Sequence, residues 1–195
     1  IDTSAWTAPS FIESWGRENI TEGFIAPMEP AMIYGARLNG ARSGDVPRSN
    51  TPALDVAGAV ARELGVTAFS KAEGTVPAGE GVKELAKVES PTLRERIEKL
   101  METSDNVMAE AVGRELSGSD PVGETLRILG EHFQIPADLK IFDNSGMSKA
   151  NRIPAEFLDS LMFAAAKDNS RLSAILATLP VAAGTGTLES RYTTL

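Results

Sequence analysis

Apolar residues recur at helical spacing along most of this sequence, and this pattern constrains the fold more than any other feature. Spacings of three and four residues predict helices within residues 56–64, 93–101, 108–116, 122–133, 157–165 and 172–179. Such stripes normally face a hydrophobic core. We therefore expect burial for stripe residues that include Val60, Leu64, Leu93, Leu116, Leu158 and Met162.

The first 50 residues lack this helical pattern. They are rich in Pro, Gly and aromatic residues, which predicts extended segments and turns. Residues 31–38 are predicted to form a strand that ends at the turn signal Asn39-Gly40. The polar residues 41–50 that follow argue against a simple hairpin.

These predictions describe an α/β fold that is mostly helical, with a few strands of an incomplete antiparallel sheet. Residues 1–50 would be an extended, turn-rich segment leading into the sheet, and residues 51–195 the helical part of the same incomplete domain. Two or three strands do not form a stable sheet alone. We therefore expect the other strands outside this chain. The ends, Ile1 without a leader and Leu195 without a tapering tail, also favour a piece of a longer protein.

Composition excludes several functional classes. The net charge is -8, from 19 Lys and Arg against 27 Asp and Glu, which argues against nucleic acid as the main partner. There is no Cys, which excludes disulfides and thiolate metal sites, and the single histidine, His132, cannot build a metal cluster. His132 is predicted to be structural or at the surface. No apolar run approaches the roughly 18 residues of a membrane span.

Three small polar residues, Ser104, Asp105 and Asn106, interrupt the helical pattern. Ser, Asp and Asn are preferred helix N-caps, so capping alone would explain them. The alternative is the S-D-N element of serine penicillin-recognising enzymes. Ser104 would then relay a proton, and Asn106 would hydrogen-bond the substrate and the catalytic lysine. Asp105 would point away and brace the loop.

The surroundings of this element favour the second alternative. Residues 88–112, VESPTLRERIEKLMETSDNVMAEAV, contain a Ser-Pro helix start at Ser90-Pro91 and an Asn-x-x-Ala-Glu run from Asn106. Further matches are DNSGMSKANR at 143–152, LPVAAGTGTL at 179–188, FIAPM at 24–28 and RSNTPA at 48–53. In this order they resemble the D-Ala-D-Ala carboxypeptidases of the peptidase S13 type, the DacB or penicillin-binding protein 4 group.

The resemblance implies a β-lactamase/transpeptidase-like fold and a serine peptidase that works outside the cytoplasmic membrane. It would hydrolyse the terminal D-Ala-D-Ala bond of peptidoglycan stem peptides through an acyl-enzyme, and β-lactams would acylate the same serine. Ser104 and Asn106 would be catalytic, and no cofactor is implied.

The resemblance also places two residues beside the pocket for the stem-peptide side chain, Met147 and Lys149. Lys149 stands where the family usually has Arg, so bidentate carboxylate binding is lost. Lys149 and Arg152 as plain solvated cations remain the alternative. Asp143 is predicted to form a turn rather than to bind a ligand.

Two parts of the family's site are missing. No Ser in the chain is followed by Lys three residues later, so the nucleophile and its lysine are absent. Residues 184–187, GTGT, imitate the K-T-G strand without its lysine, but the flanking residues favour a turn that precedes that strand.

The chain alone is therefore predicted to be an inactive part of an active enzyme. A pseudoenzyme that binds cell-wall peptides or a protein partner, and an unrelated helical interaction domain, are the alternatives. The sequence does not distinguish carboxypeptidase from endopeptidase and gives no oligomeric state.

Overall fold

A computed structural model describes residues 1–75, 79, 81, 83–167 and 172–193. Within them the elements follow in the order η1 (Glu13–Trp15), α1 (Glu18–Glu22), η2 (Ile33–Ala36), α2 (Pro52–Glu63), α3 (Leu93–Thr103), α4 (Asn106–Leu116), α5 (Pro121–His132), α6 (Ala155–Ala166), α7 (Ser173–Leu176) and η3 (Gly186–Leu188).

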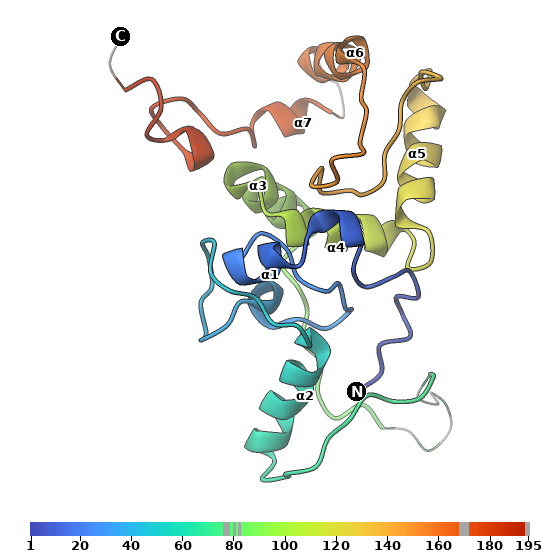
Figure 1. Ribbon diagram of the computed structural model, residues 1–195, viewed down its shortest axis with the longest axis vertical. Coiled ribbons are helices and arrows are strands. Elements are labelled where there is room, and N and C mark those ends of the chain that lie inside the picture. The colour runs from blue at the N-terminus through green and yellow to red at the C-terminus, as the bar shows by residue number, and fades with distance from the viewer. Residues whose placement is uncertain (76–78, 80, 82, 168–171, 194–195) are drawn as a thin grey trace.

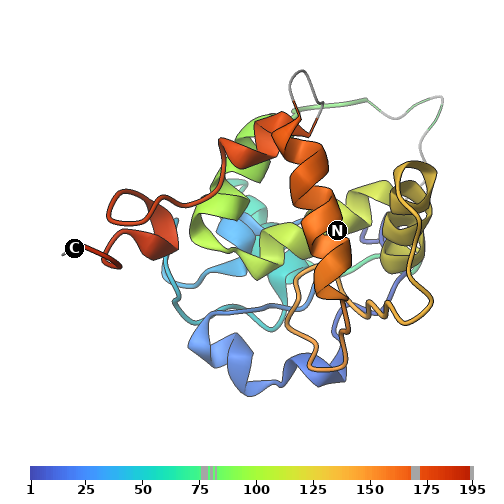
Figure 2. The same ribbon diagram turned by 90° about the horizontal axis from the view of Figure 1, so that it is seen from above.

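Helix α4 crosses the centre of the molecule, with α2 at one end of the long axis and α6 at the other (Figure 1). Helices α3 and α5 both pack on α4, and α6 packs on α7. The C-terminal segment that carries η3 extends away from the body on the side of α3 (Figure 2). The described helices include none long and apolar enough to cross a membrane.

The predicted strand over residues 31–38 is wrong. Tyr34 and Gly35 adopt left-handed φ angles of 49° and 64°, which turn the chain into η2 instead of extending it. The described residues form no sheet, and their β pairing consists of the isolated bridges Arg37↔Arg48 and Lys140↔Arg152. The turn at Asn39-Gly40 is confirmed, with left-handed φ angles of 56° and 72°.

The start of α3 differs from the predicted one by two residues. Thr92 is the N-cap: its side chain accepts a hydrogen bond from the backbone N–H of Glu95, and the Glu95 carboxylate accepts one from the backbone N–H of Thr92. This reciprocal capping box fixes the helix start at Leu93. Ser90, predicted as the cap, lies outside the helix and is exposed. His132 ends α5 and is exposed, in agreement with a surface role.

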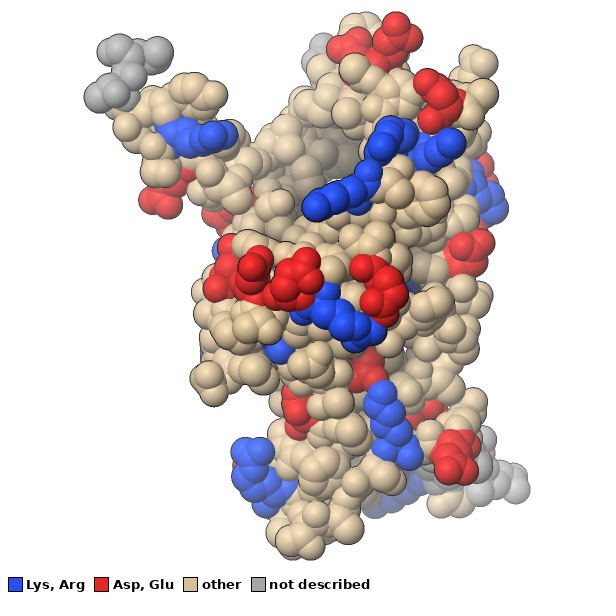
Figure 3. All heavy atoms as spheres, viewed as in Figure 1, with Lys and Arg blue, Asp and Glu red and all other residues tan. Residues whose placement is uncertain are grey.

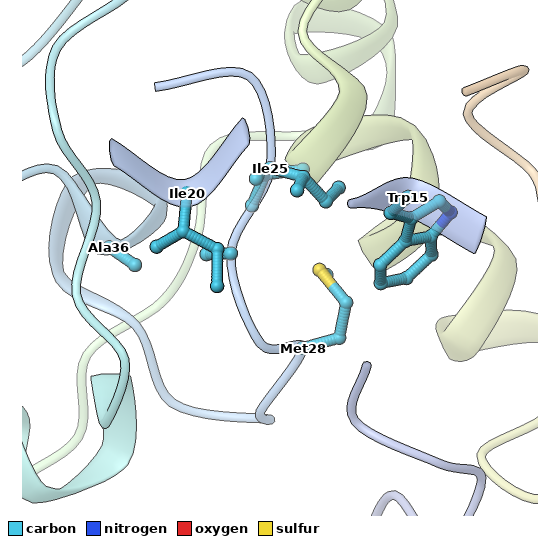
Figure 4. Close-up of a cluster of buried hydrophobic side chains, with 7 residues drawn as sticks. Trp15, Ile20, Ile25, Met28 and Ala36 are labelled. Atoms are coloured by element: carbon cyan, nitrogen blue, oxygen red, sulfur yellow. The ribbon is translucent and has the colours of Figure 1, made fainter. Parts of the chain in front are cut away.

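The core is built mainly by the first 36 residues against α4. Its seven buried side chains are Trp15, Ile20, Ile25, Ala26, Met28, Ala36 and Val107. Figure 4 draws this cluster and labels all of them except Ala26 and Val107. Phe11 packs edge-on against Trp15, with ring centroids 5.3 Å apart. The segment without a helical pattern therefore supplies most of the core, and α4 completes it through Val107.

Several stripe residues predicted to be buried are exposed instead. Leu64 is 71% exposed, Val60 54% and Leu93 53%, and the same holds for Leu116, Leu158 and Met162. Helix α2 buries only Pro52, Ala53 and Ala61, α6 buries only Phe157 and Ala165, and α3 buries no residue. The core prediction was wrong for these helix faces.

Candidate active-site cleft

The junction of α3 and α4 consists of the three polar residues found in the sequence. Ser104 ends α3 with a left-handed φ of 55°, and Asp105 caps α4 by accepting a hydrogen bond from the backbone N–H of Met108 at 3.1 Å. Asn106 is the first residue of α4. A left-handed conformation at a residue other than Gly costs on the order of 1–3 kcal/mol and is common at functional sites. The junction is therefore a helix cap and also holds Ser104 in a strained conformation.

The side chains of the junction point in different directions. Asp105 is buried, 8% exposed, whereas Ser104 is exposed. The amide nitrogen Nδ2 of Asn106 donates to the carbonyl of Phe24 at 3.1 Å. Among the described residues, no protein group donates a hydrogen bond to the Asn106 side-chain oxygen. Asp105 thus braces the junction, as the sequence predicts, and the other two face outward.

Asp105 is ionised in a buried setting because two arginines surround it. Arg37 Nη2 lies 2.8 Å from Asp105 Oδ2, and Arg48 Nη2 lies 3.6 Å from Oδ1. Burial by itself would raise the pKa of Asp105, but the charges of Arg48 and Arg37 and the hydrogen bonds from Arg37 and Met108 outweigh it. The pKa of Asp105 is therefore lowered.

Ser104 and Asn106 line one open cleft of about 360 Å³. Its other walls come from the 24–48 segment, from the end of α3 and from η3, and include Phe24, Lys99, Glu102, Gly186 and Thr187. The two residues are accessible from this cleft and are not sealed beneath packed helices. The space is enough for a dipeptide-sized group.

The wall formed by residues 184–187 approaches α3 closely. Gly186 has a φ of 60°, and a Cβ at this position would lie 2.2 Å from the backbone oxygen of Glu102. Only glycine permits this approach. The predicted turn is confirmed, since the backbone N–H groups of Gly184 and Thr185 both donate to the carbonyl of Val181 at 2.9 Å. The position of Thr187 in the cleft was missed by the sequence reasoning, although the GTGT similarity was a signal for it.

Met147 and Lys149 do not line this cleft. Met147 is half-buried against the core cluster. Lys149 is exposed, and its backbone oxygen accepts a hydrogen bond from Arg152 Nη1 at 2.8 Å. The structure brings Ser104 and Asn106 together but does not bring these two residues to them.

Asp143 organises the loop that carries Met147 and Lys149. Its Oδ1 accepts hydrogen bonds from the backbone N–H of Gly146 and the side chain of Asn151, at 2.9 and 2.7 Å. Its Oδ2 accepts from the backbone N–H of Ser148 and the indole Nε1 of Trp15, at 2.6 and 2.8 Å. The predicted turn-forming role is confirmed, and the link to Trp15 in the core is an addition that local sequence does not show.

Glu110 ties the same loop to α4. It is 1% exposed, and its Oε1 accepts hydrogen bonds from the backbone N–H groups of Asn144 and Ser145 at 2.6 and 2.8 Å. Burial raises the pKa of Glu110 and the nearby Asp143 raises it further, and the hydrogen bonds that favour the charged form do not offset this.

The stability of the protein is expected to fall as pH rises through the raised pKa of Glu110. The group binds a proton more tightly when folded than when unfolded, so its favourable contribution is complete below the ordinary value of 4.5 and is lost above the folded pKa. Glu110→Gln keeps the acceptor oxygen and should flatten the stability curve between these values, as measured by urea unfolding at a series of pH values. Glu63→Gln, at an exposed position of α2, is the control. An unchanged curve in Glu110→Gln would contradict the expectation.

The surface of the molecule carries charges of both signs. In the view of Figure 3, Lys and Arg side chains alternate with Asp and Glu, and the molecule is hollowed between the C-terminal segment and the part that carries α6. Several charges are paired, such as Arg96 with Glu115 and Lys99 with Glu102. No continuous basic face is visible in this view.

Comparison with known proteins decides the family. Residues 40–195 match the D-Ala-D-Ala carboxypeptidase 3 (S13) family. The chain belongs to this family. The S13 resemblance inferred from the S-D-N element and its neighbouring motifs is therefore confirmed.

Two curated carboxypeptidases are similar over nearly the whole chain. One is from Mycobacterium tuberculosis, 37% identical over 201 residues, and the other is carboxypeptidase DacB of Mycolicibacterium smegmatis, 37% identical over 202 residues. Each match covers 98% of this chain but only 43% of the relative. The chain therefore corresponds to less than half the length of these two relatives.

Solved structures support the same fold. Penicillin binding protein 4 (dacB) from Haemophilus influenzae matches with a TM-score of 0.57 and 24% identity, over 75% of this chain and 34% of that one. The same protein in complex with a novel β-lactam matches with a TM-score of 0.54 and 26% identity, over 74% and 36%. The chain has part of the penicillin-binding fold. Its described residues contain none of the strands that the sequence analysis expected.

Proposed function

We propose that this chain supplies the S-D-N part of the active site of a serine-type D-Ala-D-Ala carboxypeptidase. The observation that carries the proposal is the shared cleft of Ser104 and Asn106 in a member of the S13 family. The substrate would be a peptidoglycan stem peptide, and the enzyme would act outside the cytoplasmic membrane, where that polymer lies. A solved relative binds a β-lactam, and we propose the same for this protein.

The nucleophile must come from outside these residues. The chain has no Ser-x-x-Lys and matches only 43% of its relatives, which leaves room for that motif elsewhere in the full-length protein. The chain by itself would then be inactive. The K-T-G element would also be supplied from outside.

The chemistry assigns one step to each polar residue. The nucleophilic serine oxygen bonds to the carbonyl carbon of the scissile amide, and its proton passes through Ser104 to the leaving nitrogen as the C–N bond breaks. D-Ala leaves, and water then attacks the acyl ester, which releases the shortened peptide and restores the serine. Asn106, bound to Phe24 through Nδ2, presents its side chain at the cleft to position the substrate amide.

Met147 and Lys149 remain proposed contacts for the stem-peptide side chain. They lie on the Asp143 loop outside the cleft lining. Their contact with a substrate would therefore involve a part of the peptide that extends beyond the cleft around Ser104.

The proposal is tested with the full-length protein and a fluorescent penicillin. A covalent adduct, together with release of D-Ala from a synthetic peptide ending in D-Ala-D-Ala, is expected for the wild type. Ser104→Ala should slow acylation by about 10²-fold, in the range of lost acid–base catalysis. Ser119→Ala, exposed near the far end of α4, is the matched control and should acylate like the wild type.

The opposite outcome is equally clear. If folded full-length protein forms no adduct and releases no D-Ala, the peptidase proposal is wrong. The pseudoenzyme alternative would then stand, in which the scaffold binds cell-wall peptides or a protein without cleaving them.

A further inference from the structure

Two arginines, Arg37 and Arg48, flank residues 38–47, and the sequence analysis gave neither of them a role. Arg37 and Arg48 pair with each other through an isolated β-bridge and enclose residues 38–47 between them. Both side chains are buried, with 9% and 1% of their surface exposed. Both reach the same carboxylate, that of Asp105, between the two residues that face the cleft.

The arginines connect Asp105 to four separate backbone points. Arg48 Nε donates to the carbonyl of Gly23 at 2.5 Å and its Nη1 to that of Gly35 at 2.7 Å. Arg37 Nε donates to the carbonyl of Gly44 at 2.9 Å and its Nη1 to that of Tyr34 at 3.0 Å. Asp105 is thus fixed to the core segment, to the strained turn of η2 and to the loop that follows it.

These contacts leave the guanidinium groups little capacity for a substrate. Each of the three nitrogens of Arg37 has an oxygen within 3.0 Å, and each of those of Arg48 has one within 3.6 Å. Both arginines line the cleft, but their donors are already bound to protein groups. A direct role in holding the substrate is therefore disfavoured, and an indirect role through Asp105 is favoured.

The position of Asp105 sets the orientation of Ser104 and Asn106, because it lies between them in the chain. The peptide bonds on either side of Asp105 lead directly to Ser104 and Asn106. A change in the backbone torsion angles of Asp105 would turn the Ser104 hydroxyl and the Asn106 amide away from their shared cleft. The left-handed φ of 55° at Ser104 is a conformation that a free junction would relax.

We propose that Arg37 and Arg48 are positioning residues, which hold Ser104 and Asn106 in their working orientation through the carboxylate of Asp105. This inference rests on the proposed function, because it assigns the two arginines to the same reaction. They do not contact the reacting atoms.

The test compares arginine variants of the full-length protein by the kinetics of acylation with a fluorescent penicillin. Arg37→Met is expected to lower the maximal acylation rate by about 10- to 100-fold, the cost of small misplacements of catalytic groups. The half-saturating penicillin concentration should stay within about twofold, because Arg37 does not bind the ligand. Arg37→Lys, which keeps the charge but not the fork of donors, should recover part of the rate.

A matched control separates positioning from general stabilisation. Arg96 on α3 pairs with Glu115 on α4, at 2.5 and 2.8 Å, and so joins the same two helices away from the cleft. Arg96→Met is expected to lower the melting temperature but to leave the acylation rate within about twofold. In addition, the rate losses of Arg37→Met and Asp105→Asn should not add in the double variant, since both act through one contact.

The outcomes separate the two proposals. If the wild type forms an adduct but Arg37→Met and Arg37→Lys acylate at the wild-type rate, the positioning role is wrong and the peptidase function stands. If Arg37→Met does not fold, Arg37→Lys decides alone, and an unchanged rate in it overturns the inference. If the wild type forms no adduct, the proposed function fails and this inference fails with it.

Discussion

Trp15→Ala is expected to lower the free energy of unfolding by about 3–5 kcal/mol, the usual cost of removing a buried Trp side chain. Trp15 is 2% exposed, lies in the core cluster and packs edge-on against Phe11. Its indole Nε1 also donates to Asp143 Oδ2 at 2.8 Å, so the substitution creates a cavity and removes a buried donor. Urea unfolding followed by circular dichroism measures the loss.

Trp15→Phe separates the two contributions. Phenylalanine keeps much of the ring volume but has no N–H, so its cost should be smaller, on the order of 1–3 kcal/mol. Trp6, which is only partly buried beside the same core, supplies the comparison: Trp6→Ala should cost less than Trp15→Ala. Equal losses at Trp6 and Trp15 would show that the core is not centred on Trp15.

Asp143→Ala is expected to cost about 3–5 kcal/mol, because it leaves four donors without their acceptor. The loop over residues 143–151 would lose its central contact, and Met147 would lose its position against the core. The measurement is again urea unfolding, combined with hydrogen exchange at the backbone N–H groups of Gly146 and Ser148.

Asp143→Asn gives a sharper form of the same test. Each oxygen of Asp143 accepts two hydrogen bonds, and an amide replaces one of these oxygens by a donor, so only one pair can be kept in either orientation. The loss in free energy of unfolding should be smaller than that of Asp143→Ala but clearly above zero. The exposed Asp159→Asn on α6 is the control. A loss for Asp143→Asn as small as that of the control would rule out the described network.

The polar junction of the helices was predictable from the sequence because its signals are local. Ser, Asp and Asn are the residues that end one helix and begin another, and the surrounding motifs occur in a family order. The turns at Asn39-Gly40 and at residues 181–185 are local as well and were predicted correctly. The positions of α2 to α7 follow from apolar spacing, apart from shifts of a few residues at their ends, whereas α1 lies in a segment that was predicted to be extended.

The core and the support of Asp105 were not predictable in the same way. Helical spacing shows that one face of a helix is apolar, but it does not show that the aromatic first 36 residues take the place against α4. The bond from Arg37 to Asp105 joins residues 68 positions apart, and no local pattern contains it. The strand prediction at residues 31–38 failed because Tyr34 and Gly35 adopt left-handed conformations. Their carbonyls accept hydrogen bonds from Arg37, three residues after Tyr34, and from Arg48, 13 residues after Gly35.

The bond between Trp15 and Asp143 spans 128 positions. A ribosome that adds about 5–20 residues per second needs roughly 6–26 s to make that stretch. Until Asp143 is made, the indole N–H of Trp15 has no acceptor, and the core cannot close fully around this side chain. Because the core closes only through such long-range contacts, we expect it to fold more slowly than a core of the same size built from local contacts.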